Sequence, residues 1–483
     1  MHKSNKVVIS SGGGGLADEL IMGNSSQKLA ERCSFLSKNE IPIVAASFKN
    51  ASKNSDKIKE EELLKYWGAQ FDPRLGQFIS NFLFGPAETR ANTVSFERYA
   101  ELFVYCTRGT VDERTNVLFW AIGQNPFEVH EIAYPPLREL IEAVSSSFLR
   151  AIKLQNGREY QSWENKGFRI CSEFVQKLAE SLSSDIVVQR GIQKVTRSDA
   201  EAWFQRNPTF GKMLEYVFNH LYNIRPSQKQ STDEQRDENK RTTTTIYTDC
   251  LLPYCEGLEY VPDYPAFIDL SQLIFINSHL PGDLRKKWRF LFSSQMHGES
   301  FSTLLGRIIE QGPTVLIIED NNGHIFGGFA PVEWKVSPNF EGTDDAFLFS
   351  LKPKMRCYPG TTINNHYQYL NLHCQTMPNG LGMGGQHDYW GIWLDNEYGK
   401  GNCSESCTTY KGYTQLSANK DFLIRNVEVW GVGDKPEKEE SEERSMKKSV
   451  LDENEDAKAI LKIAGRREYS EGLREEEITE EPQ

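Results

Sequence analysis

Apolar residues recur at helical spacing through the first half of the chain. Between about residues 41 and 224 they stand three and four positions apart in short segments, so each segment would present one apolar face. The segments cover residues 61–67, 77–84, 96–106, 117–122, 137–149, 168–182 and 213–224. We therefore predict an all-helical region over residues 41–224.

The pattern changes to short strand-like runs in the second half. Aromatic and aliphatic residues fill these runs, and turns containing glycine or asparagine separate them. The runs cover residues 314–319, 324–334, 347–351, 366–371, 389–394 and 422–430. Apolar stripes at helical spacing accompany them within residues 270–280 and 301–309. Many strands with few helices predict the α+β class, with two antiparallel sheets packed as a sandwich over residues 246–434.

Three segments are mainly polar or charged. Residues 1–40 are polar and rich in serine and glycine, which predicts disorder. Residues 225–245 contain no large apolar side chain and have the composition of a linker. Residues 435–483 form a charged tail that holds 16 Asp and Glu against 10 Lys and Arg, a net charge of −6.

One helix is predicted inside this tail, over about residues 450–464. Four apolar residues stand there at i, i+3, i+4 and i+7, the narrow stripe of a helix. They are Ala457, Ile460, Leu461 and Ala464. Ser449 is placed for a capping box, and two arginines after the stripe suit the helix dipole. A helix of this length is marginal alone, so we expect its stripe to dock on a partner or on the chain's own domains.

Composition sets the outer limits. The length of 483 residues suggests about three domains, and 39% hydrophobic with 25% charged residues is typical of globular proteins. No apolar run approaches the ~20 residues of a membrane span, and no secretory signal is recognised at the start. Nine scattered cysteines indicate reduced thiols in the cytoplasm. A net charge of −12 disfavours nucleic acid as a partner.

The second half carries motifs of a known family. Residues 288–308 read WRFLFSSQMHGESFSTLLGRI and residues 327–334 read GGFAPVEW. Residues 376–394 read TMPNGLGMGGQHDYWGIWL and residues 427–433 read VEVWGVG. In this order the segments resemble the TLDc-domain family. The resemblance implies a β-sandwich domain and a binding or regulatory protein rather than an enzyme, with no catalytic residue, cofactor or metal.

The resemblance extends beyond the domain to one subgroup of the family. It rests on GLGMGGQH at residues 380–387, SVLD at 449–452, SEGLR at 470–474 and an internal MGNSS at Met22. These segments resemble TLDc proteins associated with mTOR, which are related to a nematode regulator of insulin/FoxO signalling. The resemblance implies a cytoplasmic protein, peripheral on the lysosomal membrane, that supports mTOR signalling. Its implied partners are mTOR pathway components and the V-type proton ATPase.

His297 and Ser300 are the first candidates for chemistry, as a base beside a nucleophile. The sequence around them is HGES and has no G-x-S-x-G elbow. Ser300 also directly precedes an apolar helical stripe, where a helix needs its N-cap. We therefore interpret Ser300 as a helix cap.

Side chains suited to zinc also occur in the second half. They are Cys403, Cys407, His366, His373, Cys374 and His387, but their spacing matches no common zinc motif, and we predict free thiols.

The glycine-rich segment at residues 380–385 does not fit a phosphate loop, because strand-like YWGIW follows the glycines instead of a helix. The glycines Gly380, Gly382, Gly384 and Gly385 are interpreted as a tight loop that the backbone, not a ligand, requires.

A degenerate EF-hand is a third candidate, in the helical region. Asn50, Ser52, Asn54 and Glu61 stand at positions 1, 3, 5 and 12 of a calcium-binding loop. Position 6 is serine instead of glycine, position 8 is lysine, and the four ligands include one carboxylate. With a weaker second loop at residues 86–97, we predict a structural helix–loop–helix pair.

An oxidation-resistance or redox role is the alternative function, since some TLDc relatives are associated with oxidation resistance. It needs an accessible cysteine of low pKa beside positive charge. Cys357 follows Arg356 and is the best placed by sequence.

A lipid anchor is the last candidate. Translation from Met22 would expose Gly23 as the acceptor of a myristoyl group, although the sixth motif position is glutamine. One such chain binds membranes only marginally, so a second anchor is required, either a partner protein or acylation of Cys33.

Overall fold

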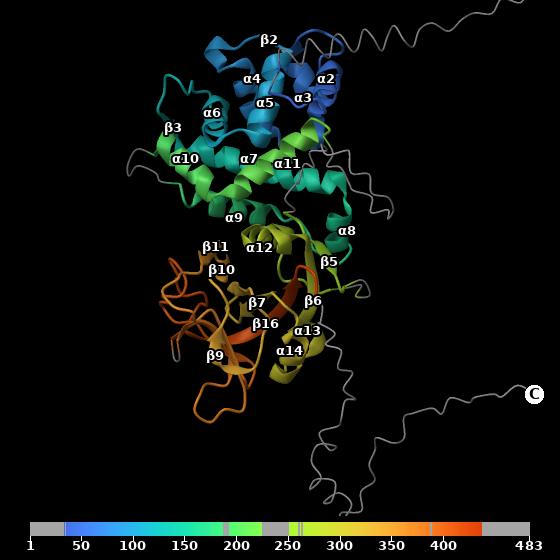
Figure 1. Ribbon diagram of the computed structural model, residues 1–483. Helices are drawn as coiled ribbons and strands as arrows, with labels where there is room; N and C mark the ends of the chain where they lie inside the picture. Colours follow the sequence, from blue (N-terminus) through green and yellow to red (C-terminus); the bar gives the residue numbers. More distant parts are fainter. Residues whose placement is uncertain are drawn as a thin grey trace, which may run out of the picture. The chain divides into compact units, whose positions relative to one another are not determined.

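The computed structural model describes residues 33, 35–186, 193–224, 251–258, 261, 264–386 and 389–436 (Figure 1). Helices fill residues 33–224, which we call the helical region, and strands dominate residues 251–436, which we call the β region. The predicted linker at 225–245 and the predicted tail helix at 450–464 lie outside the described residues, as do residues 1–32.

Each apolar segment predicted in the first half falls on an α-helix of the helical region. The helices are α2 (Glu40–Ala51), α3 (Glu60–Trp67), α4 (Pro73–Phe84), α5 (Phe96–Arg108), α6 (Val111–Ala121), α7 (Tyr134–Gln155), α8 (Arg158–Glu164), α9 (Ser172–Ser183), α10 (Arg197–Arg206) and α11 (Pro208–Leu221). Side chains cap several helix starts. Thr110 accepts a hydrogen bond from the N–H of Glu113 at α6, and Asp72 accepts one from the N–H of Arg74 at α4.

Two small antiparallel sheets connect the loops of this region. Strand β1 (Ile58–Lys59) pairs with β2 (Thr93–Val94), and β3 (Glu131–Ala133) pairs with β4 (Lys194–Thr196). Since β1 directly precedes α3 and β2 precedes α5, the first sheet joins the loops of two helix–loop–helix units. Strands β1 and β2 lie within the two predicted loops, at residues 50–61 and 86–97, so the structural helix–loop–helix pair predicted there is seen in the structure.

The β region contains three α-helices in its described part and a large sheet system. The helices are α12 (Leu270–His279), α13 (Ser294–His297) and α14 (Phe301–Ile308). The strands are β5 (Tyr254–Glu256), β6 (Lys287–Ser293), β7 (Thr314–Asp320), β8 (Ile325–Ala330), β9 (Ser337–Glu341), β10 (Phe347–Lys352), β11 (Arg356–Pro359), β12 (Gln368–Asn371), β13 (Gly380–Gln386), β14 (Tyr389–Asp395), β15 (Lys400–Asn402) and β16 (Asp421–Val432). The predicted α+β class is confirmed.

The strands form two layers that share β16. The first sheet has the order β11-β10-β8-β7-β16-β6-β5, and the second has the order β16-β15-β14-β13-β12-β9. The first residues of β16 pair with β15, and its remainder pairs with β6 and β7. All pairs are antiparallel except β5 with β6, which is parallel. One long strand therefore crosses from one layer of the sandwich to the other.

One sequence interpretation is wrong. Residues 380–386, interpreted as a tight loop, form strand β13, which pairs with β12 and β14 in the middle of the second sheet. Glycine is rare in strands, so the pattern gave no strand signal here.

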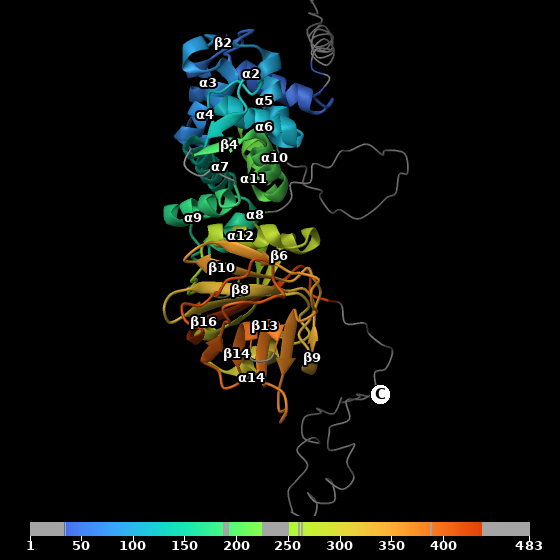
Figure 2. The ribbon, with the colours of Figure 1, turned by 90° about the vertical axis from the view of Figure 1, so that its left-hand side faces the viewer.

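Alternating residues of the first sheet belong to two different cores. Leu316 and Ile318 of β7 pack with Leu381 and Met383 of β13 between the two sheets. Val315 and Ile317 face the other way, into a core shared with α12 and with helices of the helical region. Figure 2 shows α12 on one side of the sheet that holds β8 and β10, and β13 and β14 on the other side. The helical and β regions therefore share one hydrophobic core.

Candidate functional site

Ser300 serves as the N-cap of α14, as predicted. Its Oγ accepts a hydrogen bond from the N–H of Thr303 at 3.3 Å. Nδ1 of His297 accepts one from the N–H of Ser293 at 3.1 Å. The imidazole packs against Phe290 and Phe292, and burial lowers its pKa. Both side chains therefore have structural partners of their own.

The predicted zinc-type residues do not converge. Burial raises the pKa of the Cys403 thiol to about 12, and burial likewise raises the pKa of Cys407. His366 stacks on Phe340 with ring centroids 4.1 Å apart, and His387 lies outside the described residues. In the part of the chain that the structure describes, no group of three His, Cys, Asp or Glu side chains could hold a metal, and the cysteines are free thiols.

Cys357 is the cysteine best placed by sequence for the alternative redox role, but its pKa shift opposes that role. Burial raises its pKa, whereas a nucleophilic thiol needs a lowered one. Cys374 has the favourable shift instead, because the N–H and hydroxyl of Thr376 stabilise its thiolate and lower its pKa. A positively charged neighbour in the sequence was the criterion for a reactive cysteine. Cys374 was not singled out because the groups that lower its pKa belong to a turn.

The EF-hand-like loop contains a positively charged side chain, Lys53. The Oγ of Ser52 donates to the carbonyl oxygen of Ser55 at 2.7 Å, and Glu61 is exposed. The ammonium of Lys53 forms an ion pair with Glu62 at 3.3 Å. The side chains of Ser52 and Lys53 are therefore engaged in contacts of their own.

An aromatic cluster packs against the glycines of β13 on the outer face of the second sheet. The rings of Trp390 and Trp393 stack with centroids 4.4 Å apart, and Tyr369 lies 5.3 Å from Trp390. A Cβ added at Gly382 would lie 2.5 Å from the Trp390 ring, and one at Gly380 would lie 2.5 Å from the Trp393 ring. The rings therefore rest on backbone that has no side chain.

The other two glycines of β13 have a conformational reason. Gly384 and Gly385 have φ of +75° and +83°, which L side chains rarely adopt. A Cβ at Gly385 would lie 1.8 Å from the carbonyl oxygen of Tyr389. We therefore still expect substitution at either position to destabilise the fold.

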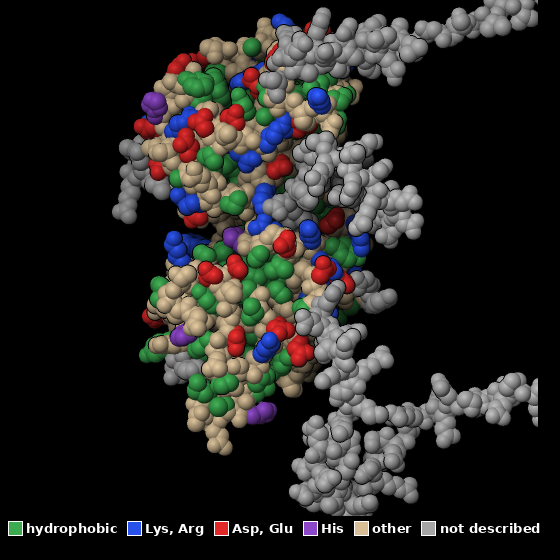
Figure 3. Space-filling view, in the orientation of Figure 1, with side chains coloured by type: hydrophobic (Ala, Val, Ile, Leu, Met, Phe, Trp, Pro, Cys, Tyr) green, Lys and Arg blue, Asp and Glu red, His purple; other side chains and the backbone are tan. Residues whose placement is uncertain are grey.

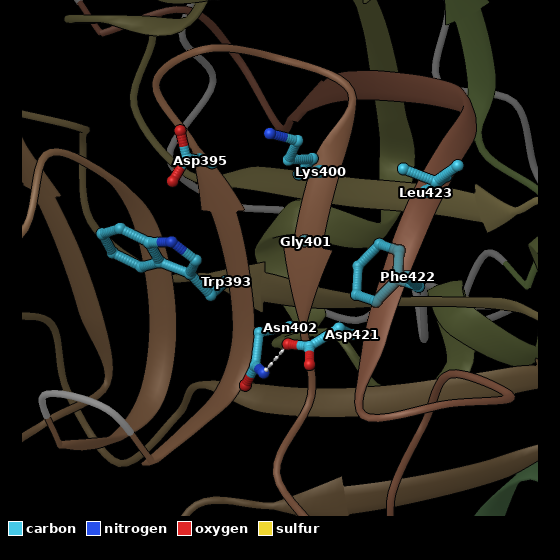
Figure 4. Close-up of a pocket in the computed structure, with 8 residues that line it drawn as sticks. All are labelled: Trp393, Asp395, Lys400, Gly401, Asn402, Asp421, Phe422 and Leu423. Carbon is cyan, nitrogen blue, oxygen red and sulfur yellow. Dashed lines mark hydrogen bonds between the residues drawn. The ribbon is translucent and has the colours of Figure 1, made fainter.

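Beside this cluster lies a pocket of about 380 Å³ (Figure 4). Strands β14, β15 and β16 line it through Trp393, Asp395, Lys400, Gly401, Asn402, Asp421, Phe422 and Leu423. Figure 4 shows Asp395 and Lys400 at one end and the Asn402–Asp421 hydrogen bond at the other, with the Phe422 side chain directed toward Gly401. That hydrogen bond measures 2.6 Å between Nδ2 and Oδ1.

The pocket can receive a polar group on an apolar stem. The indole of Trp393 and the exposed side chain of Leu423 supply apolar surface. The Oδ1 of Asn402 is buried and accepts no hydrogen bond within the described residues. Two carboxylates, Asp395 and Asp421, outnumber the ammonium of Lys400. The arrangement suits an inserted side chain that donates a hydrogen bond.

A buried carboxyl lies where the β region meets the helical region. Glu428 of β16 accepts hydrogen bonds from the hydroxyl of Tyr264 and, at 3.1 Å, from the indole N–H of Trp430. It is 1% exposed, and burial raises its pKa to about 7. The indole of Trp163 from α8 packs on Trp430 with centroids 5.2 Å apart. The site thus combines a titratable group with the contact between the two regions.

Several predicted positions concern membranes. Gly23 and the tail stripe Ala457, Ile460, Leu461 and Ala464 lie outside the described residues. Cys33, considered as a second acylation site, is 0% exposed, so an acyl chain could not reach its thiol in this fold. Among the described helices none has the length and apolar character of a membrane span. Figure 3 shows acidic and basic side chains interspersed over the described residues of one face.

Comparisons with known proteins agree with the motifs. The TLDc domain model matches residues 262–433. The MTOR-associated protein MEAK7 of Gallus gallus is 36% identical over 406 residues, 81% of this chain and 81% of its own. The Homo sapiens protein of that name is 35% identical over 408 residues, 81% of this chain and 83% of its own. Oxidation resistance protein 1 of Mus musculus is 28% identical over 212 residues, 41% of this chain and 24% of its own.

Proposed function

This chain belongs to the MEAK7 family of TLDc-domain proteins, and on that premise we propose that it is a non-enzymatic regulator of mTOR signalling. One observation carries the proposal. The similarity to proteins named as mTOR-associated covers 81% of this chain, far more than the matched domain at residues 262–433. The helical region is therefore part of the likeness, and a function that needs both regions is favoured.

The proposed place of action is the cytoplasmic face of the lysosomal membrane, with the V-type proton ATPase as a partner. The β region offers the pocket beside Trp393 for such contacts. The tail offers the apolar stripe of the predicted helix at residues 450–464. Two contact points on one chain would strengthen attachment to a large assembly through effective concentration.

The tail contact is tested by Ile460→Asp combined with Leu461→Asp in the full chain. In a pull-down from lysosomal extract, the variant should recover at least tenfold less V-ATPase and mTOR than the unaltered chain, as measured with antibodies. Lys458→Asp with Lys462→Asp adds two aspartates off the stripe and should retain binding. A large fall in thermal stability of the first variant would show instead that the stripe belongs to the chain's own fold.

Membrane attachment is proposed to begin at Gly23 when translation starts at Met22. Expression of that form with alkynyl-myristate should give a labelled protein, and Gly23→Ala should remove the label. Absence of label on the Met22 form would end the proposal. Since Cys33 is buried, the second anchor is assigned to a partner protein.

A redox role is the second candidate, and the lowered pKa of Cys374 is the observation that favours it. Iodoacetamide labelling at neutral pH separates the two functions. Labelling of the half-buried Cys374 far faster than of the exposed Cys171 would favour thiol chemistry. Similar rates at both positions would leave only the regulatory function.

A further inference from the structure

The turn between α6 and β3 exposes an aromatic side chain. Its sequence is Gln-Asn-Pro-Phe-Glu, residues 124–128. Phe127 is 78% exposed, the highest value for a large apolar side chain in the described residues, while the neighbouring Pro126 is buried. The labels α6 and β3 mark the two ends of this turn in Figure 1.

The turn is held rigid from within. Oδ1 of Asn125 accepts a hydrogen bond from the N–H of Phe127 at 3.1 Å, and its Nδ2 donates to Oε1 of Glu128 at 2.7 Å. The N–H of Glu128 donates to the Asn125 carbonyl oxygen at 3.1 Å, which closes the turn. Proline fixes its own φ at the second position. Phe127 is therefore presented by a preformed turn.

The base of the turn is held from outside by Arg197 of α10. Its guanidinium donates to the carbonyl oxygen of Pro126 at 3.5 Å and forms ion pairs with Asp112 of α6 and Glu201 of α10. Its backbone N–H donates to the carbonyl oxygen of His130 at 2.9 Å. Because the fold has already ordered the turn, binding a partner would cost the turn little conformational entropy.

We propose that the Asn125–Glu128 turn is a docking element whose Phe127 ring enters an apolar pocket of a partner protein with a basic rim. Rigid, central aromatic side chains are typical anchors of protein interfaces. The exposed side chain of Glu128 directly follows Phe127, and its carboxylate suits lysine or arginine on the partner. The same carboxylate opposes insertion into a membrane surface, because cytoplasmic leaflets are anionic.

A photocrosslinker tests this in the full chain. p-Benzoylphenylalanine replaces Gln124, which is exposed and leaves the Asn-Pro-Phe sequence intact. After irradiation in cytosolic extract, a crosslinked product should form. A cyclic Gln-Asn-Pro-Phe-Glu peptide should displace it, and the peptide with alanine for asparagine should not. Phe127→Ser and Asn125→Ala should each reduce the product at least tenfold.

Control variants show whether the product depends on the turn itself. Leu154→Ser removes another exposed apolar side chain, on α7, and should leave the product unchanged. Phe127→Ser should melt like the unaltered chain, since its ring is exposed.

The proposal is overturned if no product forms, if it persists in Phe127→Ser or Asn125→Ala, or if the cyclic peptide fails to compete. A product of two copies of this chain would also overturn it, because the ring would then contact a second copy. Flotation with anionic vesicles that Phe127→Ser abolishes would overturn it in favour of a membrane contact.

Discussion

Glu428 shows how one residue can link stability to pH. Its carboxyl is buried among the aromatic side chains Trp430 and Tyr264, and its pKa is raised to about 7 from 4.5. The fold therefore favours the protonated form. Below the unfolded pKa both states hold the proton, and above pH 7 the folded state must bury a charge.

We expect the free energy of unfolding to fall as pH rises from about 4.5 to 7. The shift corresponds to about 3 kcal/mol, at 1.36 kcal/mol per pKa unit. Asp269, whose pKa burial also raises to about 7, contributes in the same direction. Urea titrations from pH 5 to 8 should show the slope, and Glu428→Gln should reduce it. An equal slope in Glu428→Gln would mean that other groups govern the pH dependence.

Gly384 gives a prediction about backbone conformation. Gly384→Val should lower the free energy of unfolding by more than about 2 kcal/mol, because valine is strained at this positive φ and its Cβ would lie 2.5 Å from the Tyr410 ring. Thermal and urea denaturation measure the change. Gly306→Ala is the control: it lies in α14 with no atom within 4 Å of the added Cβ and should be neutral or stabilising. A Gly384→Val variant that melts like the unaltered chain but loses partners would make the glycine a contact residue.

At the scale of elements, predictability followed side-chain pattern. The stripe at residues 301–309 and the cap Ser300 predicted α14 because both signals are local. Strand β13 was misassigned because its outward positions are glycines, whose space is filled by Trp390 and Trp393 from the next strand. The aromatic cluster and the pocket could not be predicted, since they depend on which strands become neighbours.

The loop between α2 and α3 should not bind calcium at micromolar concentrations. Lys53 already places an ammonium on Glu62, and the hydroxyl of Ser52 is used inside the loop. Calorimetric titration of chelator-treated protein with calcium should show no binding with a micromolar dissociation constant. Micromolar binding that Glu61→Gln abolishes would contradict the assignment of the pair as structural.

At the scale of the whole molecule, the two regions are joined by tryptophans. The indole N–H of Trp163 donates to the carbonyl oxygen of Pro253 at 2.7 Å, and its ring contacts Trp288 and Trp430. These residues lie far apart in the sequence, so periodicity within any one segment gave no sign of the contact. The division into a helical and a β region describes secondary structure, and the core crosses it.

We therefore expect one cooperative unfolding transition for residues 33–436. Trp163→Ala should cost about 3–5 kcal/mol, the range for a buried aromatic side chain, and should destabilise both regions together. Far-ultraviolet circular dichroism and tryptophan fluorescence should report the same midpoint. Trp120→Ala, at a half-buried position on α6, should cost less. Two separated transitions in the unaltered chain would show that the regions unfold independently.

The position of β16 has a consequence for how the chain is made. It pairs with β6, β7 and β15, yet it is the last strand before residue 436. During synthesis the described helices and the other described strands leave the ribosome before β16, and until it is made the edges of β7 and β15 lack this partner strand. A nascent chain stopped before residue 421 would present those edges to other chains. Premature termination should therefore produce aggregates, and the newborn protein should depend on chaperones until its last strand is inserted.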